Sequence, residues 1–234
     1  VLGQRAGDHL PKGEHADMFI SMMKKSYEIL KDHPVNKDRI ARGLNPANSM
    51  WIWGEGRKPK LSSFKDKFGI TGAAISAVDL IKGIAICAGL DSIDVEGSTG
   101  TLNTNYEGKA DAALAAFREG KDFVYVHLEG PDECGHQGDA EGKVLSLERI
   151  DDKIVKPIVE GLKADGEDFR FLIVPDHRTP IAVRTHTPEP VPFVLYDSTD
   201  EKPYDDTRAF NETSGSTGSK FGSGYELADY FFEK

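Results

Sequence analysis

The chain has 234 residues, of which 38% are hydrophobic, and it carries a formal net charge of −10 at pH 7. This length corresponds to one large domain or one and a half, and the apolar content suffices for a full core. The charges are spread along the chain and form no basic stripe, which excludes a role in nucleic-acid binding. No apolar run approaches the length of a membrane span, so no membrane partner is expected.

The two cysteines indicate a reducing compartment. Cys87 and Cys134 form no CxxC pair, and two thiols do not make a disulfide framework. No secretory signal is recognisable at the start of the sequence. We therefore expect a cytoplasmic protein.

The first part of the chain is expected to hold a helix and a long connection. The apolar spacing of Met18, Met22, Tyr27 and Leu30 predicts a helix over about residues 15–31. A connection rich in proline and asparagine follows and ends in NPANSMWIWGEGRKPK.

After Pro59 the pattern changes to alternating strands and helices. The sequence predicts strands over 69–78, 92–97, 121–130, 169–177 and 191–197, and helices over 79–90, 106–120, 141–163 and 225–234. Pro157 should kink or divide the helix over 141–163. This order indicates an α/β fold with a largely parallel sheet and helices on its faces.

Two of the predicted strands end in similar polar residues. EGPDECGH carries Asp132 and His136, and VPDHRTPIAVRTH carries Asp176, His177 and His186. Ligands of such sheets bind beyond the carboxyl ends of the strands. Carboxylate and imidazole together suit divalent ions such as Mn²⁺ and Zn²⁺. Asp132 and His136 converge on one point if the backbone turns once between them, as a helix or as a loop.

Each of these features has a simpler interpretation. Asp132 and Glu133 could be ordinary turn acids, and His136 or His186 alone could be a surface histidine; the pairing of two strand ends favours a site. His127 lies inside a strand and is interpreted as a core or supporting residue. Cys134 is interpreted as structural. The glycine-rich segment EGSTGTLNTNYEGK could cradle a phosphate before a helix, but it matches no nucleotide-binding motif, and a plain turn is favoured.

Several long motifs carry a resemblance to a known family. They are DHPVNKDRIARGLNPANSMWIWGEG, ISAVDLIKGIAICAGL, TGTLNTNYEGKADAAL, VHLEGPDECGHQGD and VPDHRTPIAVRTHTPEPVPF. In this order and spacing the chain resembles, over nearly its whole length, the archaeal-type cofactor-independent phosphoglycerate mutases of the alkaline phosphatase superfamily. The resemblance implies an alkaline phosphatase-like three-layer sandwich, with residues 59–234 as the C-terminal part of the metal-binding core. Residues 1–58 would be the end of an inserted substrate (cap) domain.

The resemblance also implies an activity and residue roles. Such mutases interconvert 3-phosphoglycerate and 2-phosphoglycerate in glycolysis through a phosphoserine, with two divalent ions, usually Mn²⁺, with Zn²⁺, Co²⁺ and Mg²⁺ as alternatives. By the family pattern Asp132, His136 and His186 hold one ion, and Asp176 and His177 contribute to the other. Lys82 resembles a lysine near the phosphoryl group; the alternative is a solvent-facing helix lysine. Arg42 and Arg57 could bind the phosphoglycerate substrate.

The chain also departs from the family pattern. The nucleophilic serine and one metal-binding aspartate belong to the family's N-terminal part, and no segment here replaces them. We therefore expect a C-terminal portion that is inactive by itself. The alternatives are another phosphotransferase or phosphatase of the superfamily, such as a phosphopentomutase, a non-catalytic metal-binding module, or an α/β domain without a site.

Overall fold

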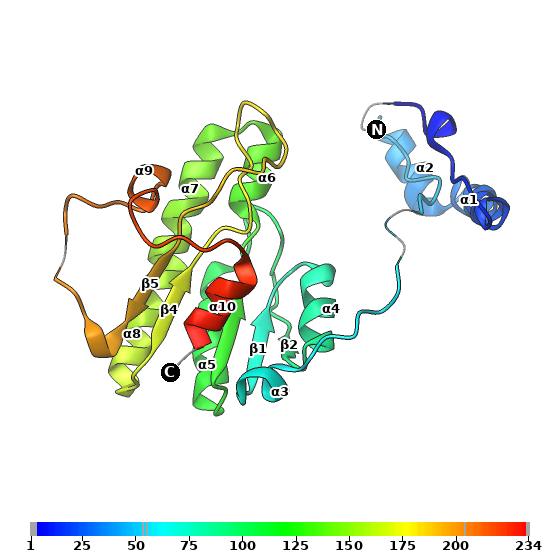
Figure 1. Ribbon diagram of the computed structural model, residues 1–234. Helices are drawn as coiled ribbons and strands as arrows, with labels where there is room; N and C mark the ends of the chain where they lie inside the picture. The colour runs from blue at the N-terminus through cyan, green and yellow to red at the C-terminus, as the bar shows by residue number, and fades with distance from the viewer. Residues whose placement is uncertain (1–3, 53, 55, 204, 233–234) are drawn as a thin grey trace. The chain divides into compact units, whose positions relative to one another are not determined.

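The computed structural model describes residues 4–52, 54, 56–203 and 205–232. The chain divides into two compact units, Val1–Pro59 and Lys60–Lys234, and each is described by itself. Figure 1 shows the elements of both units.

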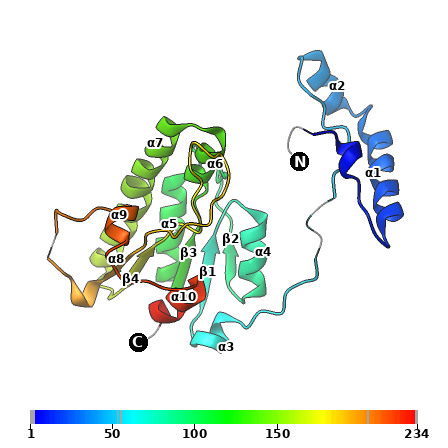
Figure 2. The same cartoon turned by 45° about the horizontal axis from the view of Figure 1, so that its top comes forward.

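The described part of the first unit is helical, with η1 (Ala6–His9), α1 (Ala16–Leu30) and α2 (Pro34–Ala41) (Figure 2). The prediction of a helix over 15–31 is confirmed by α1. The prediction of a plain connection after it is wrong, because α2 lies there. Pro34 stands in the first turn, where its missing N–H costs no helical hydrogen bond, and the His33 ring accepts the N–H of Val35. The side chain of buried Asn36 bonds to the backbone of Leu30 and Ala47 and so fixes α2 to its neighbours.

The second unit contains a three-stranded parallel sheet in the order β2-β1-β3, formed by β1 (Gly72–Ile75), β2 (Asp91–Ile93) and β3 (Phe123–Val126). β1 is central, and all four of its residues are buried. A short apolar run is typical of a parallel strand whose two faces are both covered. Strands at these places were predicted, but each observed strand is shorter than its predicted range, and β2 begins one residue before the range 92–97.

The last two strands form a separate pair. β4 (Arg170–Ile173) and β5 (Val194–Asp197) are antiparallel, and in the described residues they make their own two-stranded sheet. The chain returns from β4 to β5 through a segment without a helix, and a parallel return would need a crossover, usually a helix. The expected α/β fold is confirmed, with this antiparallel pair as an addition to the parallel strands.

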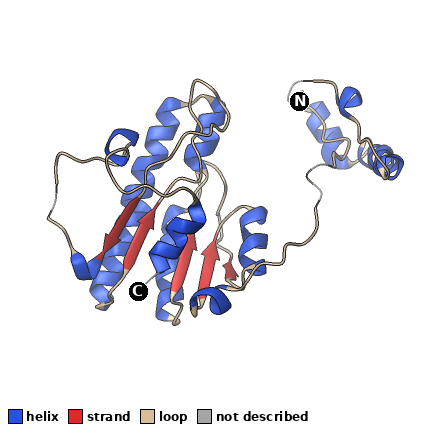
Figure 3. Ribbon diagram, viewed as in Figure 1, coloured by secondary structure: helices blue, strands red, loops and turns tan. Residues whose placement is uncertain are grey.

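Helices cover both faces of the strands (Figure 3). α5 (Tyr106–Arg118), α7 (Ala140–Ile150) and α8 (Lys156–Asp165) share one core with Ile75, Val124 and Phe171. α3 (Phe64–Phe68) and α4 (Asp79–Cys87) pack on the other face against Ala74 and Phe123, where α10 (Gly224–Phe232) adds aromatic contacts. Neighbouring strand residues thus serve opposite cores, as the alternation of side chains along a strand requires. The remaining short helices are η3 (Ser198–Asp200) and α9 (Glu212–Gly215).

Pro157 divides the long helix as the sequence predicted. A π-helical turn, η2 (Asp151–Val155), separates α7 from α8, and the Lys156 N–H bonds to the Asp151 carbonyl. Proline has no N–H for the α-helical bond four residues back, and its ring crowds that carbonyl. The wider turn before α8 accommodates both effects.

Candidate metal centre

A short helix at the end of β3 carries two of the predicted ligands. α6 (Gly130–Gln137) begins with Pro131 in its first turn and ends at Gly138, whose φ of 73° is readily adopted by glycine. Asp132 and His136 are four residues apart in this helix, so their side chains share one face. The sequence was compatible with either a helix or a loop between Asp132 and His136, and the structure shows a helix.

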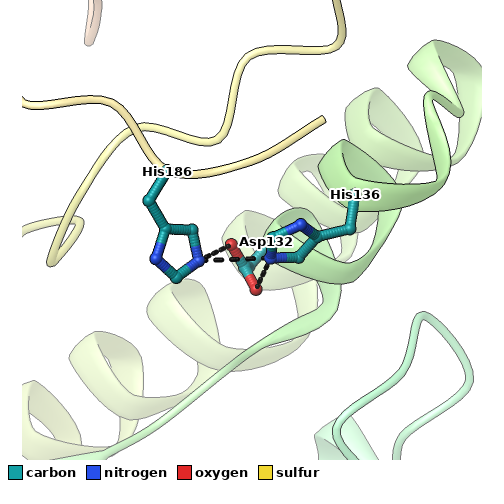
Figure 4. A group of neighbouring side chains, drawn as sticks. All are labelled: Asp132, His136 and His186. Atoms are coloured by element: carbon teal, nitrogen blue, oxygen red, sulfur yellow. Dashed lines mark hydrogen bonds and ion pairs between the residues drawn. The ribbon is translucent and has the colours of Figure 1, made fainter. Parts of the chain in front are cut away.

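Asp132, His136 and His186 converge on one point (Figure 4). The Asp132 carboxylate lies 3.3 Å from Nε2 of His136 and 3.4 Å from Nε2 of His186. One potential ligand atom from each residue falls within 4.8 Å of the others. His186 comes from the loop between β4 and β5, so the two strand ends meet as expected.

His136 is oriented through its other ring nitrogen. Nδ1 lies 3.0 Å from the carbonyl oxygen of Arg184. A carbonyl oxygen only accepts, so Nδ1 carries the proton, and in the neutral ring Nε2 keeps its lone pair for a ligand. Arg184 has a φ of 57°, a left-handed conformation that is uncommon for residues other than glycine. Proteins usually orient a metal-binding histidine through a hydrogen bond from its other ring nitrogen, as Nδ1 of His136 makes here with the Arg184 carbonyl.

His177 joins this group, and Asp176 lies at its rim. The His177 ring stacks on His186 with the ring centroids 3.6 Å apart, and its Nδ1 lies 4.0 Å from Oδ1 of Asp132. Asp176 Oδ2 lies 3.3 Å from Nε2 of His177. Its Oδ1 accepts a hydrogen bond from the backbone N–H of His177. The Asp176 side chain is 73% exposed.

Two further carboxylates surround Asp132. Glu129, Asp132 and Glu133 form a second group with ligand atoms within 4.8 Å of one another. Burial raises the pKa of Glu129, and the neighbouring carboxylates of Glu133 and Asp132 raise it further. A bound cation would offset this accumulation of negative charge. The sequence had suggested Glu133 only as a turn acid and had not singled out Glu129.

The residues present fit a divalent cation. They offer carboxylate oxygens together with imidazole nitrogens, a combination that suits Mn²⁺ or Zn²⁺. The orientation of His136 by a backbone carbonyl fits the same role.

The other predicted functional residues are placed as follows. Lys82 Nζ lies 2.6 Å from Oδ1 of Asp94, and this hydrogen bond raises the pKa of Lys82. Arg42 pairs with Asp38 at 3.2 Å, and Arg57 is exposed. Both arginines belong to the first unit. The roles of these three side chains stay predictions.

The residues interpreted as structural have local partners. His127 Nδ1 lies 3.2 Å from the Ser76 hydroxyl, and burial lowers the pKa of this imidazole. Cys134 is 4% exposed, and burial raises the pKa of its thiol, which disfavours a nucleophilic thiolate. In the glycine-rich segment the Asn105 side chain caps α5 by accepting the Gly108 N–H. This cap supports the interpretation of the segment as a plain turn rather than as a phosphate-binding loop.

Known proteins match both the sequence and the fold of this chain. The profile of the Metalloenzyme superfamily matches residues 12–228. The chain belongs to this superfamily. Its α/β architecture agrees with the alkaline phosphatase-like fold of that group. In the described residues, no helix is both long enough and apolar enough to cross a bilayer.

The chain is similar to several known proteins, some of which are named as mutases. It is 48% identical over 219 residues to the 2,3-bisphosphoglycerate-independent phosphoglycerate mutase of Methanosarcina acetivorans, covering 94% of this chain and 55% of that protein. The solved structure of a protein from Pyrococcus horikoshii is 30% identical, with a TM-score of 0.75, and the match covers 92% of this chain and 56% of that one. A cofactor-independent phosphoglycerate mutase from Thermoplasma acidophilum is 26% identical, with a TM-score of 0.52, and the match covers 92% of this chain and 50% of that one. The chain thus spans about half the length of these proteins.

Sequence reasoning missed two contributors to the centre: Thr179 bonds to Asp132, and the Arg184 carbonyl orients His136. It also missed the burial of Lys109, whose Nζ lies 3.1 Å from the His127 carbonyl. Thr179 follows the Asp176–His177 pair closely, and that position was its only signal. Every residue has a backbone carbonyl, so the residue type at position 184 does not predict this contact.

Proposed function

We propose that this chain supplies the metal-binding part of a phosphoglycerate mutase that interconverts 3-phosphoglycerate and 2-phosphoglycerate. The observation that carries the proposal is the convergence of Asp132, His136 and His186 at the ends of two strands. The names of the relatives support the choice of this reaction within the superfamily.

In the proposed site Asp132, His136 and His186 hold one divalent ion, and Asp176 and His177 contribute to a second. Mn²⁺ is the proposed metal, since mixed oxygen and nitrogen donors suit it. Bound divalent ions would stabilise the negative charge of the transferred phosphoryl group and of the attacking and leaving oxygens. The nearby carboxylates alone would repel a phosphorylated acid, so the charge of the ions is also needed for substrate binding.

The remaining residues of the proposal bind and orient the substrate. Lys82 would exchange its ion pair with Asp94 for the phosphoryl group. Arg42 and Arg57 would hold phosphate or carboxylate oxygens, for which the guanidinium fork is suited. The unit Val1–Pro59 is accordingly proposed as part of a cap domain, and Lys60–Lys234 as part of the core.

The phosphoserine step needs a serine that the resemblance does not locate in these residues. We propose that the serine and a further metal-binding aspartate come from a part of the family pattern outside the matched motifs, and that these 234 residues alone do not catalyse the reaction. The proposed location is the cytoplasm, where glycolytic substrates occur.

The test is an assay of the full product of the gene that encodes these residues. It is incubated with 3-phosphoglycerate and Mn²⁺, and the formation of 2-phosphoglycerate is followed through coupling to enolase. We expect turnover by the wild type, none in EDTA, and a rate lowered by at least about 100-fold in Asp132→Asn. Release of inorganic phosphate without 2-phosphoglycerate would instead support a phosphatase. A wild type with no activity on either readout would contradict the proposal.

A further inference from the structure

We propose that Thr179 is a positioning residue of this metal centre, whose hydroxyl fixes both Asp132 and the tautomer of His177. This inference rests on the proposed metal-binding function. It adds a residue that contacts no substrate and acts through two of the proposed ligands.

The Thr179 hydroxyl lies between ligands from two separate elements. The side chain is buried, with 4% of the residue exposed. Its Oγ1 donates a hydrogen bond to Oδ1 of Asp132 on α6 and lies 3.3 Å from Nδ1 of His177 after β4. The hydroxyl therefore joins the two segments that carry the candidate ligands.

The hydrogen-bond chemistry of a hydroxyl determines which nitrogen of His177 is protonated. A hydroxyl has one proton, and here that proton is given to the Asp132 carboxylate. The contact with His177 can then be a hydrogen bond only if Nδ1 donates and Oγ1 accepts. In the neutral ring this leaves the lone pair on Nε2, which faces Oδ2 of Asp176 at 3.3 Å. Two acceptors that face each other in this way are suitably placed to share a cation.

The backbone and methyl group of Thr179 are held firmly. Its carbonyl oxygen accepts a hydrogen bond of 2.7 Å from Nζ of Lys143 on α7. A Cβ atom added at Gly135 of α6 would lie 2.5 Å from that carbonyl oxygen and 2.9 Å from Cγ2 of Thr179. The close approach to α6 leaves little freedom for the hydroxyl to move away from Asp132.

The two parts of this side chain allow positioning and packing to be separated. Thr179→Val keeps a branched side chain of nearly the same volume but removes the hydroxyl. Thr179→Ser keeps the hydroxyl but removes the methyl group beside Gly135. If the hydroxyl positions the ligands, metal affinity follows the hydroxyl. If Thr179 only fills space, both variants affect stability and neither affects affinity selectively.

The experiment compares Mn²⁺ binding, measured by isothermal titration calorimetry, with the midpoint of thermal unfolding in wild type and both variants. We expect Thr179→Val to weaken Mn²⁺ binding by about 10- to 100-fold, the usual effect of removing a partner of a metal ligand, and Thr179→Ser to stay near the wild-type affinity. Equal affinities in wild type and Thr179→Val would overturn the inference, as would an equal loss in both variants.

A second measurement on metal-free protein is independent of metal binding. Long-range ¹H–¹⁵N correlation spectra distinguish the two neutral tautomers of His177. The wild type and Thr179→Ser should show the proton on Nδ1, and Thr179→Val should show a changed tautomer population. A wild type that binds no Mn²⁺ but shows this pattern would refute the proposed function while leaving the positioning contact intact. An Nε2 proton in the wild type would refute the inference even if Mn²⁺ binds.

Discussion

Nε2 of His136 lies 3.1 Å from Nε2 of His186, although the two residues are 50 positions apart in the sequence. Both nitrogens also point at the carboxylate of Asp132. A cation bound to these three side chains would replace the contact between the two rings with separate bonds to the ion.

Removal of His186 should therefore weaken metal binding. We expect His186→Ala to lower the affinity for Mn²⁺ by at least about tenfold, since even partners of ligands have effects of this size. Calorimetric titration checks this. The matched control is His15→Ala, an exposed histidine of the first unit, which should bind Mn²⁺ like the wild type. Equal binding by His186→Ala and the control would show that His186 is no ligand.

Gly135→Ala should destabilise the second unit. The new Cβ would meet the Thr179 carbonyl oxygen at 2.5 Å, and a backbone carbonyl cannot move aside as a flexible side chain can. We expect a loss of about 1–3 kcal/mol in the free energy of unfolding, the usual cost of overpacking. Urea denaturation measures this.

The control for Gly135 is Gly83 in α4. An added Cβ at Gly83 meets no atom within 4 Å outside its own helix backbone. Gly83→Ala should raise the free energy of unfolding by up to about 1 kcal/mol, the difference in helix propensity. Similar shifts for the two variants would contradict the packing argument.

Lys109→Met should stabilise the protein at neutral pH. Lys109 is 1% exposed, and burial lowers the pKa of its ammonium group, with Glu129 opposing this in part. Because the folded-state pKa lies below 10.5, the charged form is disfavoured by folding. This cost is complete at pH values below the folded pKa and disappears as the pH rises towards 10.5. The stability gained by Lys109→Met should therefore become smaller as the pH rises towards 10.5.

Urea denaturation of wild type and Lys109→Met at neutral and alkaline pH checks this sign. A variant less stable than the wild type at neutral pH would mean that the bond from Lys109 Nζ to the His127 carbonyl outweighs the cost of burial.

The ionised carboxylate of Asp197, at the end of β5, should stabilise the fold and lose this contribution in acid. Hydrogen bonds from the Thr199 hydroxyl, from Arg170 and from the Thr199 N–H lower the pKa of Asp197 from 3.8 to about 2. A depressed carboxyl pKa stabilises the fold fully above the unfolded value, and this contribution is lost as the pH falls through the folded value. Between pH 4 and 2, Asp197→Asn should therefore lose less stability than the wild type. Parallel acid-unfolding curves for the two proteins would be inconsistent with this pKa.

The sequence predicted those elements whose own residues determine them. α1 has a clear apolar spacing, and β1 and β3 lie in short apolar runs. The sequence did not decide between a helix and a loop over α6, because its two glycines are poor helix formers. Contacts elsewhere in the fold explain these glycines: a Cβ at Gly130 would meet the Ser146 hydroxyl, and a Cβ at Gly135 would meet Thr179.

The candidate ligands were predictable because their residue types carry the chemistry. Asp132, His136 and His186 bring metal-binding atoms wherever they stand, and strand ends brought them together. The Arg184 carbonyl is a backbone group that every residue has. A lysine in a helix is normally solvent-exposed, so the burial of Lys109 could not be predicted from the local sequence pattern.

The most direct test of the metal centre is anomalous diffraction from crystals of this chain soaked in Mn²⁺. We expect an anomalous peak between the Asp132 carboxylate and the Nε2 atoms of His136 and His186. Ordered density for all three side chains with no peak near them would contradict the account.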